Sequence, residues 1–319
     1  IVEPKISQIV IQGNKITKTH VVQRYLKIKE GELFNANKLR LSLSRLQGVG
    51  FFSDVNVNFE PGENPDDVIV VLTVEEGRTG RLGFNIAYGT QSGFGGGLSY
   101  ENTNIGGRGM KLSVGFDLGN REEYWVSYEQ PYMSGKVTAW KIGGYKRAWD
   151  DLRYYVDDQE RFRYDRDKTG AFFGFGRKFK DDSLYNWYLL FDWHEVKNEP
   201  DNPPAGYEKS NWGNIPIDEK VPPTTVLDDL GDGTYYSVTA SVRRLNIDEY
   251  LPYSKGDVQT LNVQYGQADV EGVDYSYFKY RLEAKFYFTV DKLFKDFFET
   301  SFGGNTERPV IFASRIIVG

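Results

Sequence analysis

The most constraining feature of this sequence is a regular alternation of apolar and polar residues over long segments. In 278–288, "FKYRLEAKFYF", apolar side chains occupy every second position, and the residues between them are Lys279, Arg281, Glu283 and Lys285. Successive side chains of a strand point to opposite faces, so the pattern predicts a strand with one apolar and one charged face. We expect the charged face to line a water-filled lumen and the apolar face to meet lipid.

The same alternation recurs through most of the chain after residue 77. Eleven strands are expected, over 79–88, 93–102, 108–118, 122–131, 136–147, 169–180, 184–197, 234–247, 256–267, 275–289 and 308–319. Segments of about ten residues match a tilted strand that crosses a bilayer, whereas strands of soluble proteins average about 5–6. The sequence therefore predicts an antiparallel transmembrane β-barrel over 77–319, with a soluble β-sandwich as the alternative.

Connection lengths and aromatic residues suggest an orientation for this barrel. The long connections 148–168 and 198–233 fall at one end, where the extracellular loops of such barrels lie, and most short turns fall at the other. The connection 290–307 is the exception, and it could form a small amphipathic helix at the interface. Aromatic girdles are expected at the two interfaces. Their members are Tyr88, Tyr100, Tyr128, Tyr132, Trp140, Tyr145, Tyr185 and Trp193.

Composition excludes several classes of protein. The 319 residues include no cysteine, which rules out disulfides and thiolate metal sites. A net charge of -6 gives no electrostatic case for a nucleic-acid partner. The sequence has no run of about 18 apolar residues, so no transmembrane helix is expected. Neither a nucleophile–base arrangement nor a set of metal ligands stands out, so we expect no enzyme activity, no cofactor and no metal.

Residues 1–76 form a different unit, with the predicted order β-α-α-β-β. "KISQIVIQGN" (5–14) predicts a strand that ends in a Gly-Asn turn. Thr17 or Thr19 could cap a short helix, and Asn35 is the expected N-cap of a second helix with leucines at i, i+4 and i+7. Two further strands, "FFSDVNVNFE" and "DDVIVVLTVEE", flank a "PGENP" turn.

This first unit resembles a POTRA domain. The resemblance is carried by "I.I.GN" (8–14), "L..LQGVGFFSDVNV" (43–57) and "VIVVLTVEEG" (68–77). It implies that the second strand lies at the sheet edge, where it could accept an extended peptide by strand addition. The expected edge residues are Phe52, Asp54, Val55, Asn56 and Val57.

A POTRA domain followed by a barrel resembles the BamA family of outer-membrane insertases, and here the POTRA domain would be the membrane-proximal one. Within the barrel, the resemblance rests on 83–109, on "YWVSYEQPYMSG" (124–135) and on "LPYSKGD" (251–257). The Arg-Gly-Phe loop motif of the family is absent. An odd strand count cannot close an antiparallel barrel whose ends meet on one side. We therefore expect further barrel strands beyond residue 319. The resemblance also implies further POTRA domains before residue 1.

The resemblance implies a function and a site. The protein would insert other outer-membrane proteins into the bacterial outer membrane, with its POTRA domain in the periplasm. Its partners would be unfolded outer-membrane proteins, accessory lipoprotein subunits and membrane lipid. Substrate strands would pair with the first barrel strand, which acts as a lateral gate. The gate residues are Gly80, Arg81, Leu82, Gly83, Phe84, Asn85, Ile86, Ala87 and Tyr88.

Two points stay open at this stage. Gly80 and Gly83 could weaken the gate strand or simply pack against lumenal side chains. A two-partner-secretion transporter, which also joins POTRA to a barrel, is the alternative function. A passive porin would not need the first unit.

Overall fold

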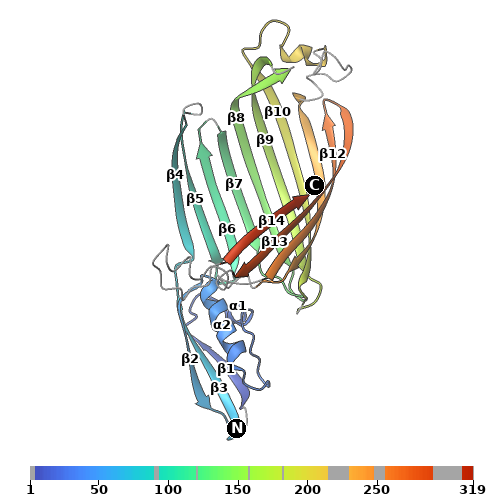
Figure 1. Ribbon diagram of the computed structural model, residues 1–319. Helices are drawn as coiled ribbons and strands as arrows, with labels where there is room; N and C mark the ends of the chain where they lie inside the picture. Colours follow the sequence, from blue (N-terminus) through green and yellow to red (C-terminus); the bar gives the residue numbers. More distant parts are fainter. Residues whose placement is uncertain are drawn as a thin grey trace, which may run out of the picture.

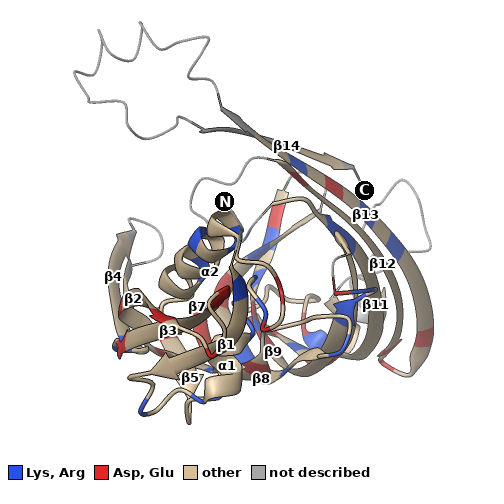
Figure 2. Ribbon diagram, turned by 90° about the horizontal axis from the view of Figure 1, so that it is seen from below, with Lys and Arg blue, Asp and Glu red and all other residues tan. Residues whose placement is uncertain are grey.

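The computed structural model describes residues 4–89, 93–119, 121–156, 159–181, 183–214, 230–247, 256–289 and 311–318. A small α/β unit lies at the N-terminal end, and a tall sheet of eleven antiparallel strands rises from it (Figure 1). Seen along its strands, the sheet curves into a trough whose two edge strands do not pair with each other (Figure 2). The predicted fold class is therefore confirmed as a POTRA-like unit followed by a curved, barrel-like sheet that is open.

The N-terminal unit has the predicted β-α-α-β-β order. Its elements are β1 (Lys5–Gln12), α1 (Thr19–Gln23), α2 (Ala36–Gly48), β2 (Phe52–Pro61) and β3 (Asp67–Glu76). The strand order is β1-β3-β2, with β1 parallel and β2 antiparallel to β3. Strand β2 consequently lies at one edge of the sheet, as expected.

Two apolar clusters hold this unit together between the helices and the sheet. The first contains Val21, Val22, Tyr25, Leu46, Phe51, Phe52, Val55 and Val74, and the second contains Ile6, Ile28, Leu39, Val70 and Leu72. Burying each Val, Leu or Ile contributes about 1.5–3 kcal/mol. The leucines of α2 that follow the helical period thus point into the core, as the sequence predicts.

Helix capping agrees with the prediction for α2 and not for α1. The Asn35 carboxamide oxygen accepts hydrogen bonds from the Asn37 and Lys38 N–H groups, each at 3.0 Å. The residue before α1 is Lys18, which makes no side-chain cap. The expected caps are wrong because Lys18 occupies the cap position: Thr17 lies one residue before it, where its hydroxyl accepts from the Asn104 amide, and Thr19 is the first residue of the helix.

Within the described residues, the large sheet has eleven strands, which is the number predicted. They are β4 (Gly80–Gly89), β5 (Gly93–Ile105), β6 (Met110–Leu118), β7 (Arg121–Gln130), β8 (Ala139–Val156), β9 (Gln159–Lys178), β10 (Tyr185–Asp201), β11 (Gly233–Leu245), β12 (Gly256–Val270), β13 (Val273–Thr289) and β14 (Ile311–Val318). Each strand pairs with its sequence neighbour, so β4 and β14 are the two edges.

The two faces of the sheet differ in crowding as well as in polarity. On the polar face, a Cβ at Gly115 would collide with Trp125, and one at Gly266 would collide with Tyr277. On the other face, apolar side chains such as Phe84 and Phe278 are 84% and 66% exposed. Side chains crowd on the concave side of a curved sheet, so we call the polar face lumenal and the apolar face outer.

One predicted loop is mostly strand. The segment 148–168 continues the β8–β9 ladder, with Trp149 opposite Arg166 and Val156 opposite Gln159. Alternation fails as a signal here because the outer face of β9 is polar too and because the β8–β9 register shifts twice, while backbone pairing continues regardless of side-chain polarity. Tyr154, Phe162 and Leu230 form a small apolar cluster against the prolonged hairpin.

Two other expected connections lie partly or wholly outside the described residues. Strand β10 runs on to Asp201, and a 3₁₀ helix η1 (Lys209–Asn214) follows it. The remainder of 198–233 is described only from Leu230 onward. The expected amphipathic helix in 290–307 lies outside the described residues.

Buried polar contacts join the N-terminal unit to the base of the sheet. The Asn104 amide donates to the Thr17 hydroxyl at 2.8 Å, and the Gly109 N–H donates to the Asn104 carboxamide oxygen at 2.7 Å. The Lys18 N–H donates to the Gly107 carbonyl at 2.8 Å. Gly107 has φ +68°, and a Cβ there would collide with the Ile16 carbonyl. The β5–β6 turn is thus shaped to receive the loop before α1.

A second contact comes from the β7–β8 connection. The Arg24 guanidinium lies 5.2 Å from the ring centroid of Tyr132, and Tyr25 makes an edge contact with the same ring at 6.0 Å. Tyr132 was expected in an interfacial girdle, but it packs against the N-terminal unit instead. Alternation cannot reveal this because the partner residues lie more than a hundred positions earlier.

Glu76, at the end of β3, holds the loop that makes the first contact. Its carboxylate accepts from the Ile16 N–H at 2.8 Å and from the Thr17 N–H. Partial burial raises the pKa of Glu76, but these N–H groups outweigh that effect and hold its pKa below the ordinary value of 4.5. The charged carboxylate is therefore the form that fastens the loop.

We expect Glu76→Gln to loosen this loop at neutral pH. Losing one charge-assisted hydrogen bond at a largely exposed site costs about 1 kcal/mol, or roughly fivefold faster amide exchange at Ile16 and Thr17. Because the folded-state pKa is lowered, the wild-type contribution is complete above pH 4.5 and is lost as the pH falls through the folded-state pKa. Hydrogen exchange measured against Glu75→Gln checks this. Equal exchange in both variants at pH 7 would contradict it.

Candidate functional site

The predicted gate strand β4 is an edge strand with one satisfied side. It pairs with β5 along its whole length, from Gly80 opposite Asn102 to Gly89 opposite Gly93. No described strand pairs with its other side. Its outer side chains are between 71% and 84% exposed, namely Leu82, Phe84, Ile86 and Tyr88. The described part of β4 therefore presents a free row of backbone donors and acceptors beside an apolar surface.

The lumenal face of β4 carries few long side chains. Arg81, Gly83, Asn85 and Ala87 alternate there. A Cβ at Gly83 would lie 2.7 Å from the Ser99 hydroxyl, so this glycine does pack closely against a lumenal neighbour. Gly80 lies in the same way against the Tyr100 hydroxyl, although on the outer side. Close packing and a weakened strand are compatible, because a glycine in a strand both allows close approach and lowers strand preference.

One polar contact crosses the second strand to stabilise β4. The Asn85 amide donates to the Asp117 carboxylate of β6 at 3.0 Å. Gly97 lies between them in the sheet, and a Cβ there would collide with that carboxylate. The glycine therefore lets a β4 side chain reach β6. The sequence showed the glycines of β5 without showing which contact needed them.

The predicted POTRA edge residues divide between two faces of β2. Phe52 and Val55 are buried in the core, and Val57 packs against it. Asp54 and Asn56 are exposed, and the Asn56 amide donates to Asp54 at 2.6 Å. An irregularity interrupts the ladder between Phe52 and Asp54. A peptide added to β2 would therefore meet backbone groups and polar side chains, with the apolar residues already occupied.

The four predicted lumenal charges of β13 share one face, and Glu283 is surrounded there by two of the others and by Arg315 of β14. The Glu283 carboxylate lies 3.1 Å from Lys285, 3.9 Å from Arg281 and 2.8 Å from Arg315. Lys279 stands apart, with its ammonium 4.8 Å from the Tyr277 ring centroid. This cluster and β4 belong to opposite ends of the sheet, so the structure does not bring the predicted groups into a single site.

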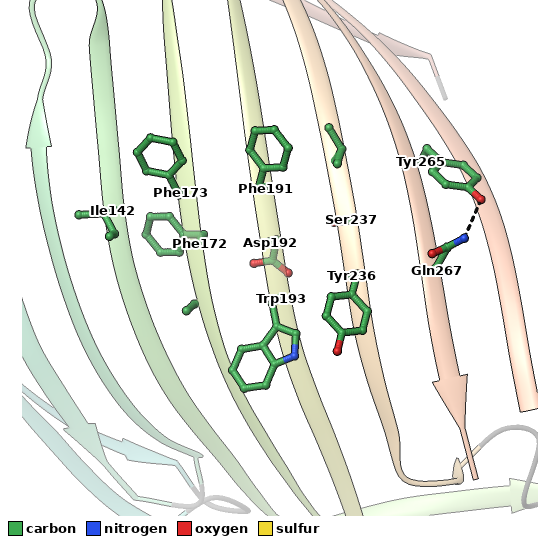
Figure 3. Close-up of a pocket in the computed structure, with 12 residues that line it drawn as sticks. Ile142, Phe172, Phe173, Phe191, Asp192, Trp193, Tyr236, Ser237, Tyr265 and Gln267 are labelled. Carbon is green, nitrogen blue, oxygen red and sulfur yellow. Dashed lines mark hydrogen bonds between the residues drawn. The ribbon is translucent and has the colours of Figure 1, made fainter. Parts of the chain in front are cut away.

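The outer face carries an apolar, aromatic surface. Figure 3 shows Phe173, Phe191, Trp193, Tyr236 and Tyr265 on neighbouring strands around a shallow groove of about 440 Å³. Tyr145 was expected among the outer aromatic residues, and that expectation is wrong. It alternates with outer Gly144 and Lys146, and its ring packs over Gly170 on the lumenal face.

Ion pairs border this apolar surface at both ends. Lys146 and Asp167 lie 3.7 Å apart on the outer face toward the prolonged hairpin. Arg244 and Asp257 pair on the outer face at the end near the N-terminal unit. Between these limits, the outward residues of β10 are Tyr185, Trp187, Leu189, Phe191 and Trp193. The charged residues thus mark the edges of an apolar band.

The described residues include no group of three or more His, Asp or Glu side chains arranged to hold a metal ion. The closest such contact is a pair, with His194 Nδ1 2.6 Å from the Asp192 carboxylate. None of the described helices has the length and apolar character needed to cross a membrane.

Comparison with known families agrees with the two-part architecture. The POTRA family, described as a surface antigen variable number repeat, matches residues 4–77. The chain is 26% identical over 198 residues to the outer membrane protein assembly factor BamA of Nitratidesulfovibrio vulgaris, covering 62% of this chain and 24% of that one. It is 27% identical over 164 residues to BamA of Buchnera aphidicola, covering 51% and 24%. The chain thus spans about a quarter of the length of these relatives.

A solved structure supports the fold. The crystal structure of BamA from Haemophilus ducreyi lacking POTRA domains 1–3 superposes with a TM-score of 0.59 at 18% identity, covering 90% of this chain and 52% of that one. The Omp85 superfamily domain matches residues 104–311, which is more than half of the chain. This protein therefore belongs to the Omp85 superfamily.

Proposed function

We propose that this protein inserts other β-barrel proteins into the bacterial outer membrane, and that the edge of β4 is where their strands are added. The proposal rests first on the family and on the similarity to BamA relatives. It rests also on the unpaired side of β4 among the described strands. Because the chain spans only about a quarter of those relatives, their activity is proposed here and not transferred.

The observation that supports the proposal most strongly concerns the two sides of β4. One side is fully paired with β5, and no described strand pairs with the other side. In lipid, each unsatisfied backbone group costs several kcal/mol. An incoming strand that satisfies these groups is therefore strongly favoured, and the pairing makes little demand on its sequence. Such a site could accept many different barrel proteins.

The apolar band supports a membrane position. From Tyr185 to Trp193, the outward apolar residues of β10 extend over nine residues of strand. A strand tilted by about 45° needs about 9–11 residues to cross a bilayer. The POTRA-like unit lies at the short-turn end, which we assign to the periplasm. The prolonged β8–β9 hairpin then projects outward from the cell.

Partners follow from the same arrangement. Unfolded outer-membrane proteins would reach the POTRA edge strand β2 from the periplasm before they meet β4. Accessory lipoproteins would bind on the periplasmic side, and lipid would cover the outer face. We propose no enzymatic step and no cofactor, because strand pairing itself supplies the driving force.

We expect Leu282→Arg to destabilise the folded protein by about 2–4 kcal/mol, the cost of a cation near the bilayer midplane. Thr260→Arg is the control. Thr260 lies on the lumenal face directly opposite Glu283, so an arginine there meets water and a carboxylate. Urea unfolding from lipid vesicles measures both variants. Equal effects, or a wild-type protein that stays folded and soluble without detergent, would contradict the membrane position.

We expect proline in β4 to impair insertion far more than alanine at the same site. Asn85→Ala removes only the side-chain bond to Asp117, whereas Asn85→Pro and Ile86→Pro each delete a backbone donor. Adjacent residues of a strand direct their N–H groups to opposite sides, so one proline disrupts β4–β5 and the other disrupts the free edge. Insertion of a test barrel protein into vesicles checks this.

Of the two prolines, the one that removes an N–H from the free edge tests the proposal more directly. This variant should reduce insertion while leaving the thermal stability of the insertase closer to wild type than the other proline does. Insertion at the wild-type rate with both prolines would rule out β4 as the pairing site.

A further inference from the structure

A lumenal cavity lies at the end of the sheet away from the POTRA-like unit, between β8 and β11. Its volume is about 520 Å³. The residues that matter for its chemistry are Trp149, Tyr164, Arg166, Lys168, Asn198 and Tyr235. None of them belongs to the gate, to the POTRA edge or to the charged ladder of β13.

Arg166 is held in place from one side. Its Nε donates to the Asn198 carboxamide oxygen at 2.6 Å, and its guanidinium lies 5.3 Å from the Tyr164 ring centroid. Asn198 is only 1% exposed, and its amide donates to the Leu230 carbonyl at 2.9 Å. The two Nη groups of Arg166 make no hydrogen bond or ion pair with any described residue. A buried amide thus fixes a guanidinium that still has its terminal donors to offer.

Lys168 follows on the same face of β9 and adds a second cation. Within the described chain it forms no ion pair, and its ammonium lies 5.9 Å from the Tyr145 ring centroid. Glu123 is shared by Arg147 at 2.7 Å and Arg121 at 2.8 Å. Asp192 lies against His194 and also attracts Lys168. The cations Arg121, Arg147, Arg166 and Lys168 outnumber these two carboxylates, so positive charge is in local excess.

The aromatic walls are also positioned by neighbours. The Arg121 guanidinium lies 5.5 Å from the Trp149 ring centroid, and His194 stacks on Tyr235 at 4.9 Å. Flat aromatic walls beside a cavity of this size fit a ring-sized ligand. A fixed guanidinium beside an ammonium fits a phosphate, which accepts several charge-assisted hydrogen bonds at once.

We propose that this cavity binds a compact phosphorylated sugar, with the phosphate on Arg166 and Lys168 and the sugar ring against Trp149, which lies opposite Arg166 on the next strand. This role is independent of strand insertion at β4. Asn198 acts as a positioning residue, because it contacts Arg166 through Nε and leaves both Nη groups free for the phosphate.

Titration calorimetry of the purified protein in detergent at low salt tests the proposal, with glucose 6-phosphate, inorganic phosphate, glucose and hexaglutamate as probes. Glucose 6-phosphate should bind more tightly than phosphate, and glucose should not bind measurably. Arg166→Gln and Lys168→Gln should each weaken glucose 6-phosphate binding about 10- to 100-fold, as expected for a lost charge-assisted hydrogen bond. Arg166→Lys keeps the charge and loses the bond to Asn198, so it should lie between wild type and Arg166→Gln.

Lys197→Gln is the matched control, because Lys197 sits beside this site on β10 but on the outer face, where it pairs with Glu195 at 3.1 Å. It should bind like wild type. Equal weakening by Lys197→Gln would show unspecific charge attraction and overturn the site. Tighter binding of hexaglutamate than of glucose 6-phosphate would overturn the ligand class, and so would wild-type protein that binds no probe. Thermal unfolding identifies a variant that fails to fold, and the other β9 variant then decides.

Discussion

The large sheet depends on backbone pairing between neighbouring strands, which satisfies polar groups regardless of side chain. Every described strand from β5 to β13 is paired on both sides, so only β4 and β14 present free backbone. In water such an edge would invite aggregation, and in lipid it would be costly. The same physics that makes the edge a liability supports the proposal that strands are added there. The side chains of β4 add little to this backbone pairing, because those on the lumenal face are few and small.

Contacts between the POTRA-like unit and the base of the sheet fix the position of that unit near this edge. Thr17 and Asn104 bond across the junction close to the base of β5, the strand that pairs with β4. Tyr132 adds a contact from the β7–β8 connection. Glu76 holds the intervening loop most strongly while it is charged. Any reorientation of the POTRA-like unit must therefore break buried polar contacts close to the strand that pairs with β4.

Alternation predicted all eleven strands because most of them combine a polar lumenal face with an apolar outer face. It failed in 148–168, where the outer face is polar too and the register shifts twice, and for Tyr145, whose ring lies on the lumenal face beside aromatic neighbours. Thr17 shows a different limit, since its partner Asn104 lies 87 residues away. The hydrogen bond between Arg166 and Asn198 likewise joins residues that are far apart in the sequence, 32 positions from each other. Local sequence indicates the period of a strand. It does not indicate which side chain from a distant part of the chain will contact a given residue in the folded protein.

The most direct test of the central claim is a disulfide map between β4 and a substrate strand during insertion. The chain has no native cysteine, so single cysteines at Phe84, Asn85 and Ile86 can each be tested against one fixed cysteine in the last strand of a substrate barrel. Edge pairing predicts a high yield at one position and low yields at its neighbours, because adjacent side chains face opposite sides. Equal yields along β4, or higher yields with a cysteine at lumenal Gly170, would contradict the account and favour passage through the lumen.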